Sequence, residues 1–225
     1  GTKKNDNKFA PLPAYVFNKK GRGTFVQAYI QGGQYRGKTR EDFFVEDGVR
    51  RMEICWFSSN PNTKLTLIDP DGKHFRDFQV TGDDGTFIKG GVIYTLQIDE
   101  PIRGLWTMKA KNIQERYLLH ATYDSPLNTD LEMDLEKDEK IHLYFSTKNS
   151  TINLEHIHVK ALVEYIDIKN QLYRRRVYTN QQGIPKMTID PFGRGIYNIT
   201  IQITGETKAH TPFNRTIIES TYFGS

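Results

Sequence analysis

Residues 32–39, from Gly32 to Thr39, match the G-x-x-x-x-G-K-T pattern of a phosphate-binding loop. Such a loop works only between a buried strand and a helix that begins at its Lys-Thr pair, because the N-terminal amides of that helix bind the phosphate. Residues 40–45 are instead a short charged stretch that leads into Phe-Phe-Val, which favours a strand. Helical segments do not alternate with strands elsewhere, as a nucleotide-binding α/β fold requires. We therefore predict that no nucleotide binds at Gly32–Thr39.

Histidines suggest a possible zinc site. His156 and His158 would share one face of a predicted strand, where two imidazoles can be presented to zinc, and His142 on the preceding predicted strand is the candidate third ligand. The alternative is that His156 and His158 face solvent while Ile157 and Val159 pack inward, which is the commoner arrangement. We favour that alternative and predict no metal site and no cofactor.

Four aspartates could donate oxygen ligands to calcium from predicted turns: Asp69, Asp71, Asp83 and Asp84. Their spacing does not match the EF-hand loop, in which glycine occupies the sixth position. Aspartate also stabilises turns without a metal, because its side chain hydrogen-bonds the local backbone. Calcium binding therefore stays open as an alternative that the turns do not require.

Covalent catalysis has little support in the sequence. Cys55 lies between Ile54 and Trp56 in a predicted strand, which is the setting of an inert structural thiol. No G-x-S-x-G motif is present to place a nucleophilic serine. We predict that the chain has no catalytic residues and is not an enzyme; a metal-dependent accessory domain of an enzyme is the remaining alternative.

The composition predicts an all-β protein. Isoleucine, threonine, tyrosine and phenylalanine are common, and aromatic residues make up 12% of the 225 residues. Branched and aromatic side chains suit a pleated surface, and short apolar segments alternate with Gly, Asp, Asn and Pro turns about every ten residues. The first half contains seven predicted strands, at residues 24–30, 42–45, 51–57, 64–68, 75–80, 92–98 and 105–110.

A second series of strands follows a connection predicted at residues 112–128, with 124–126 as the joint. Its predicted strands lie at residues 130–136, 140–146, 157–168, 172–178, 186–189, 196–204 and 215–222. Two sets of about seven short strands predict two tandem β-sandwich modules. The expected organisation is an extended lead-in at residues 1–20, module 1 at 21–122 and module 2, immunoglobulin-like, at 123–225.

Four motifs of the first half resemble those of extracellular sandwich families. They are F-x-V-x-x-G at residues 43–48, an apolar strand at 52–56, L-x-L-x-x-P-x-G at 65–72 and P-x-x-G-x-W at 101–106. Residues 43–112 thereby resemble the immunoglobulin-like domain that follows von Willebrand factor A domains, as in hemicentin-like proteins. They are also similar to bacterial pre-peptidase C-terminal domains. The resemblance implies a β-sandwich outside the cell and no specific activity.

Two aromatic residues follow turns at corresponding places in the two halves. Pro101 and Gly104 allow a sharp entry, after which Trp106 is expected to point between the sheets. Tyr197 follows Gly193 and Gly195 in the same way. We expect Tyr197 to form a tyrosine corner, in which its hydroxyl bonds to nearby backbone.

Charge and cysteine content suggest the setting of the protein. The net charge is +4 and the positive residues are scattered among acids, which does not predict nucleic-acid binding. A single cysteine, Cys55, excludes an internal disulfide and favours a bacterial envelope or a cytosolic home. No apolar run is long enough to span a membrane. Together with the family resemblance, this predicts a secreted or cell-envelope location, periplasmic or at the cell surface.

The predicted function is non-catalytic binding or adhesion within a larger secreted or envelope protein. The expected partner is a protein or glycan at the cell surface, contacted by loops at residues 32–40, 81–91 and 180–185. The basic run Arg174–Arg176 is expected on a solvated strand, with a glycan, lipid headgroup or acidic partner as the alternative. A structural spacer next to a von Willebrand A or peptidase domain is the second reading of the same modules.

Overall fold

The computed structural model describes residues 27–34, 36–85, 89–114, 116–127, 129–135, 140–147, 152–179 and 186–223. These residues form strands and turns, and no helix occurs among them. The prediction of an all-β protein is confirmed. The described part therefore also contains no helix that could cross a membrane.

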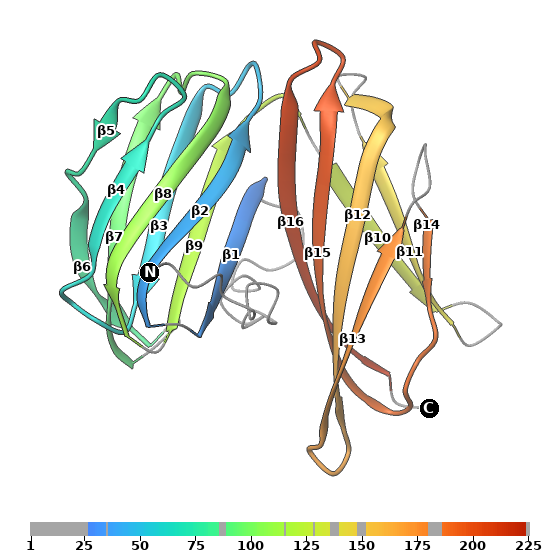
Figure 1. The fold of residues 1–225 in the computed structure, drawn as a ribbon. Helices are drawn as coiled ribbons and strands as arrows, with labels where there is room; N and C mark the ends of the chain where they lie inside the picture. Colours follow the sequence, from blue (N-terminus) through green and yellow to red (C-terminus); the bar gives the residue numbers. More distant parts are fainter. Residues whose placement is uncertain are drawn as a thin grey trace.

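The strands of the first half form two antiparallel sheets (Figure 1). Sheet I has the order β1-β9-β3-β7-β6, with β1 (Ala28–Gln34), β9 (Arg116–Asp124), β3 (Arg51–Ser58), β7 (Lys89–Asp99) and β6 (Gln79–Asp84). Sheet II has the order β2-β8-β4-β5, with β2 (Gly37–Val45), β8 (Gly104–Ile113), β4 (Lys64–Ile68) and β5 (His74–Phe75).

The second half also forms two antiparallel sheets. Sheet III has the order β13-β12-β15-β16, with β13 (Leu172–Thr179), β12 (Ile152–Asp167), β15 (Gly195–Thr207) and β16 (Pro212–Phe223). Sheet IV has the order β10-β11-β14, with β10 (Thr129–Leu135), β11 (Ile141–Thr147) and β14 (Lys186–Ile189).

One kind of tight turn joins neighbouring strands three times. In the turn after β4, Asp69 N donates to Lys73 O and Gly72 N donates to Asp69 O, both at 3.0 Å. The same two bonds recur in the turns that begin at Asp167 and Thr207. The fourth position of each turn has positive φ and is occupied by Gly72, Asn170 or His210, which are residue types that adopt this conformation more readily than most. The sequence predicted the first of these turns correctly from its Asp-Pro-Asp-Gly signature.

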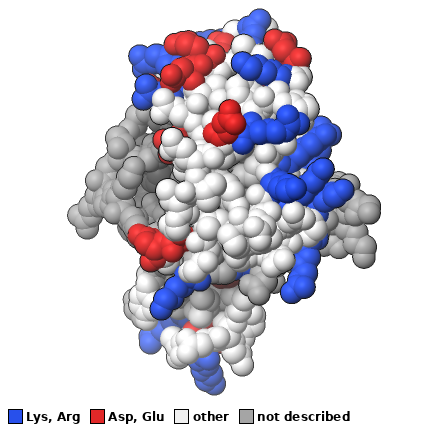
Figure 2. Space-filling model, turned by 90° about the vertical axis from the view of Figure 1, so that its left-hand side faces the viewer, with Lys and Arg blue, Asp and Glu red and all other residues white. Residues whose placement is uncertain are grey.

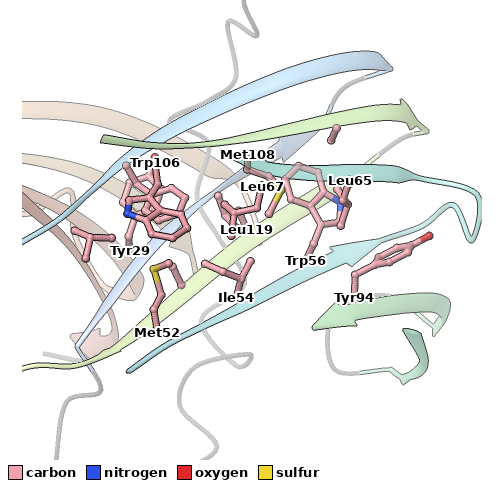
Figure 3. Packing of buried hydrophobic residues seen from close by; sticks show 14 of the residues in the cluster. Tyr29, Met52, Ile54, Trp56, Leu65, Leu67, Tyr94, Trp106, Met108 and Leu119 are labelled. Carbon is pink, nitrogen blue, oxygen red and sulfur yellow. The ribbon is translucent and has the colours of Figure 1, made fainter. Parts of the chain in front are cut away.

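The core of the first half lies between sheets I and II (Figure 3). Alternate residues of β3, namely Met52, Ile54 and Trp56, point across to Leu67 of β4 and Met108 of β8, and all five are 0% exposed. Full burial of one such side chain stabilises the fold by about 1.5–3 kcal/mol. The period of two along each strand therefore fixes which face of each sheet turns inward.

A second apolar cluster lies on one face of sheet III. It is built from alternate residues of β12, β15 and β16, together with Leu127 and Ile189, which lie outside that sheet. A third, smaller cluster joins the halves, because Ile218 of β16 packs with Ile30 of β1 and Leu118 of β9. Strands β1 and β16 accordingly lie side by side (Figure 1).

The structure corrects two expectations about the strands. The single strand predicted at residues 75–80 is divided into β5 and β6, which belong to different sheets. The segment 112–128 was expected only to connect two modules, but it contains β9, which pairs with both β1 and β3. The lead-in predicted at residues 1–20 lies outside the described residues.

Candidate functional site

The residues of the phosphate-loop pattern lie on two extended strands. Residues 32–34 belong to β1 of sheet I, and residues 37–39 belong to β2 of sheet II. The Lys-Thr pair therefore begins no helix and has no row of N-terminal amides beside it. The segment 32–40 was also expected to be an exposed loop; this is wrong, because only residues 35 and 36 lie between the strands.

The described histidines lie on different sheets. His142 is buried on β11 of sheet IV, where its Nδ1 is 3.3 Å from Thr188 Oγ1. His158 is exposed on β12 of sheet III, next to the inward-facing Ile157. The side chain of His156 lies outside the described residues. Among the residues that the structure describes, no cluster of metal-ligating side chains is found.

Two of the candidate calcium ligands are used by their own turns. Asp69 Oδ1 accepts hydrogen bonds from Asp71 N and Lys73 N, both at 2.9 Å. Asp83 Oδ1 accepts one from Gly85 N at 3.0 Å. These bonds give both carboxylates a structural role that needs no metal.

Cys55 is held in its unreactive form. Burial, followed by the nearby Glu53 carboxylate, raises the pKa of the Cys55 thiol to about 12. The thiol also lies 3.6 Å from Glu53 Oε1 and donates to it. Because the thiolate is the reactive form, this environment is the opposite of the one that activates a catalytic cysteine.

Trp106 lies where the sequence predicts. Its side chain is 1% exposed between sheets I and II, and its Nε1 donates to Ile102 O at 2.8 Å. The second predicted anchor, Tyr197, forms the expected tyrosine corner. Its buried hydroxyl accepts from Phe192 N at 2.9 Å and Gly193 N at 3.0 Å, and donates to Gly193 O at 2.6 Å.

Gly195, two residues before this tyrosine, has no room for a side chain. Its φ is +151°, and a Cβ there would lie 2.1 Å from Ile166 O on the neighbouring strand. Backbone atoms cannot yield that distance without moving the strand, so only glycine fits.

A buried ion pair joins the two halves of the chain. Arg215 Nη2 on β16 lies 2.5 Å from Glu46 Oε2 directly after β2, and the two side chains are 1% and 0% exposed. Arg215 Nε also donates to Gln27 Oε1 at 3.3 Å, and its guanidinium lies 4.3 Å from the ring centroid of Tyr123. Ser125 Oγ donates to the same Glu46 oxygen at 2.7 Å. We call this group of five residues the junction.

The junction leaves two polar atoms unpaired. Glu46 Oε1 and the hydroxyl of Tyr123 are buried and have no hydrogen-bond partner among the described residues. Burial raises the pKa of Tyr123 well above its ordinary value, although the Arg215 charge opposes the shift and Glu46 adds to it. Leaving a buried charge without its partner costs free energy. The ion pair therefore constrains how the two halves are arranged.

Further hydrogen bonds connect the edge of sheet I to sheet III. Ile30 N of β1 donates to Thr216 Oγ1 at 2.9 Å, and Gln202 Nε2 donates to Ile30 O at 3.1 Å. An edge strand normally exposes such backbone groups to other chains. Here side chains of the second half satisfy them, so β1 is covered by sheet III.

The sequence did not identify the junction. Glu46 and Arg215 are separated by 169 positions, and each looks like an ordinary surface residue in its local context. One signal was available: Arg215 lies between Phe213 and Ile217, on the inward side of an alternating strand. A charged residue at an inward position usually has a buried partner.

An apolar row crosses the outer face of sheet III near one end. Leu172, Ile166, Ile196 and Tyr222 lie opposite one another in register on the four strands. Leu172, Ile196 and Tyr222 are 48%, 43% and 61% exposed, and Ile168 in the adjacent turn is 73% exposed. A contiguous exposed row of this kind is typical of a contact surface for another protein.

The run Arg174–Arg176 lies on β13, and Arg174 and Arg175 are exposed there, as the sequence predicts. Arg174 Nε lies 3.6 Å from Glu164 Oε2. Arg175 stacks over the ring of Phe192, with 4.4 Å between its guanidinium carbon and the ring centroid. The side chain of Arg176 and the predicted contact loop at 180–185 lie outside the described residues. The other predicted loop, 81–91, consists mainly of the ends of β6 and β7.

Comparisons with known proteins give one informative likeness. The chain is similar to the crystal structure of Bacillus licheniformis lipase BlEst2 in propeptide form, with a TM-score of 0.64 and 28% sequence identity over 92% of this chain. This chain spans 43% of the length of that lipase chain. A β-glucuronidase of Ruminococcus gnavus matches at 11% identity over 82% of this chain and 36% of its own, but its TM-score of 0.23 carries no argument. No protein-family model and no curated protein matches the chain.

Proposed function

We propose that this chain is a non-catalytic segment that accompanies the catalytic domain of a secreted lipase or esterase precursor. The observation that carries the proposal is the likeness to a lipase in propeptide form, which extends over nearly the whole of this chain but less than half of the lipase chain. A hydrolase of the G-x-S-x-G type needs a serine at a strand-to-helix turn. The sequence has no such motif, and the described residues have no helix.

The proposed architecture is two tandem β-sandwich modules, with sheets I and II in the first and sheets III and IV in the second. Separate apolar clusters in the two halves support this division. The junction would then hold the modules in one arrangement, because separating them would leave the charges of Arg215 and Glu46 without their partners. A rigid arm of this kind suits the alternative role of a spacer equally well.

The proposed contact with the catalytic domain is the apolar row on sheet III. Its apolar side chains are too exposed to stabilise the chain by themselves, and burial against a protein surface would remove them from water. The sequence predicts a protein or glycan at the cell surface as the partner. The partner proposed here is instead a hydrolase domain. On the basis of the same comparison, the proposed location is secreted.

The proposal can be tested on the intact polypeptide purified from its source. A fluorophosphonate probe labels activated serines, and mass spectrometry of the digest locates the label. We expect peptides of this chain in one polypeptide with a labelled domain, and no label within residues 1–225. A labelled serine inside the chain, or a polypeptide without any labelled domain, would overturn the proposal.

A second measurement tests the contact surface. Hydrogen exchange of β13 and of its turn to β12 should be slower in the intact polypeptide than in the isolated 225-residue chain. The double variant Leu172→Asp/Ile196→Asp should remove that protection. The matched control, Ile102→Asp/Leu105→Asp, changes two equally exposed apolar residues of the first half and should leave it unchanged. Equal exchange in both unmodified forms would exclude the apolar row as the contact.

A further inference from the structure

The outer face of sheet II concentrates positive charge. Five exposed cations lie on three neighbouring strands of this sheet, and we call them the basic face: Lys38 and Arg40 of β2, Lys109 and Lys111 of β8, and Lys64 of β4. The carboxylate on the same face is Asp42, which bonds Arg40 Nε at 3.1 Å and accepts from Thr107 Oγ1. Five cations and one carboxylate make +4, which equals the net charge of the whole chain.

The strand register places four of these five cations directly opposite one another. Lys64 pairs with Lys111 across β4 and β8, and Arg40 pairs with Lys109 across β2 and β8. Like charges at directly opposite positions destabilise a sheet. None of the four lysines forms an ion pair with a described residue. Folding therefore does not explain the basic face, whereas binding of an anion would relieve its repulsion.

The geometry suits a linear polymer better than a compact ligand. Successive outward residues of one strand lie about 7 Å apart and neighbouring strands about 5 Å apart, so the cations form two parallel rows on a flat surface. A repeating chain of anionic groups can follow such rows and neutralise several cations at once. Among the described residues of this face, Thr107 is a buried polar side chain, and its hydroxyl already donates to Asp42, so it does not select a single small anion.

The neighbouring residues distinguish between anionic polymers. Proteins that bind single-stranded nucleic acid stack the bases on aromatic side chains. The two rows of cations contain no aromatic side chain, and the third position in the row of Arg40 and Lys109 is Thr66. A bilayer surface normally requires apolar side chains that insert among the lipids, and the rows lack these as well. Figure 2 shows Lys and Arg side chains gathered along one border of the first half, with Asp and Glu mostly elsewhere.

We propose that the basic face binds a linear phosphodiester polymer without bases, of the poly(glycerol phosphate) type. The inference is independent of the proposed link to a lipase. Binding would attach the protein to a polyanionic matrix, while the apolar row on sheet III remains accessible. Lys38, which belongs to the phosphate-loop pattern in the sequence, would contact phosphate here through its surface position and not through a nucleotide-binding loop.

Fluorescence anisotropy with labelled poly(glycerol phosphate) tests the proposal on the 225-residue chain. Each neutralised phosphate contributes about 0.7 to the slope of log affinity against log salt for a flexible strand. Four to five contacts then predict a loss of roughly 10²-fold in affinity between 50 and 200 mM NaCl. The variant Lys109→Gln/Lys111→Gln should bind at least about tenfold more weakly at 50 mM and lower the slope by about 1.4.

The matched control is Lys160→Gln/Lys208→Gln, which removes the same charge from exposed positions of the second half. It should bind within about twofold of the unmodified chain, since local contacts and not net charge carry the affinity. In the absence of polymer, Lys109→Gln/Lys111→Gln should unfold at an equal or higher temperature, which excludes misfolding as the cause of weak binding.

Four results would overturn the proposal. The first is no measurable binding at 50 mM salt, and the second is equal weakening by the two double variants. The third is binding of oligodeoxythymidylate of the same charge as tightly as poly(glycerol phosphate). The fourth is tighter binding to vesicles containing phosphatidylglycerol than to the free polymer.

Discussion

Removing the buried guanidinium of Arg215 should be the most costly single change at the junction. The Glu46 carboxylate is 0% exposed, and in Arg215→Ala it would keep the bond from Ser125 Oγ, one of its two described contacts. Breaking a buried pair from one side costs about 3–5 kcal/mol, because an uncompensated charge is left behind. We expect a loss of about 4 kcal/mol in the free energy of unfolding, which is roughly a 10³-fold change in the equilibrium constant.

The assay is urea unfolding followed by two probes. Both tryptophans of the chain, Trp56 and Trp106, lie in the core between sheets I and II, so their fluorescence reports the first half. Circular dichroism reports the strands of both halves. The two curves should coincide in the unmodified chain and separate in Arg215→Ala, since the junction couples the halves.

The control is Arg50→Ala, which breaks an exposed ion pair with Asp124 whose side chains are 71% and 58% exposed. Exposed pairs contribute about 0–1 kcal/mol, so this variant should remain close to the unmodified chain. A double-mutant cycle with Glu46→Gln and Arg215→Met isolates the coupling, which should exceed about 1 kcal/mol. The reasoning fails if Arg215→Ala costs no more than Arg50→Ala, or if the two changes in the cycle are additive.

Three further outcomes follow from single positions. Tyr197→Phe should lose about 2 kcal/mol of stability in urea unfolding, because the backbone groups of the tyrosine corner lose their buried partner. Tyr222→Phe, at an exposed position, should be neutral, and equal effects of the two variants would contradict a stabilising role of the tyrosine corner. Gly195→Ala should cost about 3 kcal/mol in thermal or urea unfolding, since its Cβ meets backbone, while Gly82→Ala, with open space around it and no positive φ, should stay within about 0.5 kcal/mol. The raised pKa of Cys55, about 12, keeps its thiol protonated until the pH approaches that value. A disulfide reagent at pH 8 should therefore react about 10³-fold more slowly with the folded than with the urea-unfolded chain. Comparable rates would refute the shift in the pKa of Cys55.

The sequence predicted the features that depend on local patterns. The alternation of Leu65 and Leu67 predicted a strand with one buried face, and the structure has β4 there with both residues buried. The Asp69 turn and the inward direction of Trp106 were likewise predicted from a few adjacent residues. These predictions hold because strand period and turn geometry are set within about ten residues.

Features that depend on burial on both faces were missed. Strand β9 carries consecutive apolar residues, Tyr117, Leu118 and Leu119, all 0% exposed, so it shows no alternation. One face packs in the core between the sheets and the other packs toward β16. A strand with two buried faces has no period of two to recognise, so the sequence pattern predicts a connection there.

The sequence by itself determined that the chain forms short strands, where its turns lie and which side chains turn inward, because these follow from residue type and spacing along one strand. Only the tertiary structure decided which distant residues meet. It brings Arg215 to Glu46 across 169 positions, and it lines up Lys64 with Lys111 through the register of β4 and β8. The buried pair of Arg215 and Glu46 leaves no periodic mark in the sequence, because the free energy that selects it arises only when distant strands exclude water around both charges.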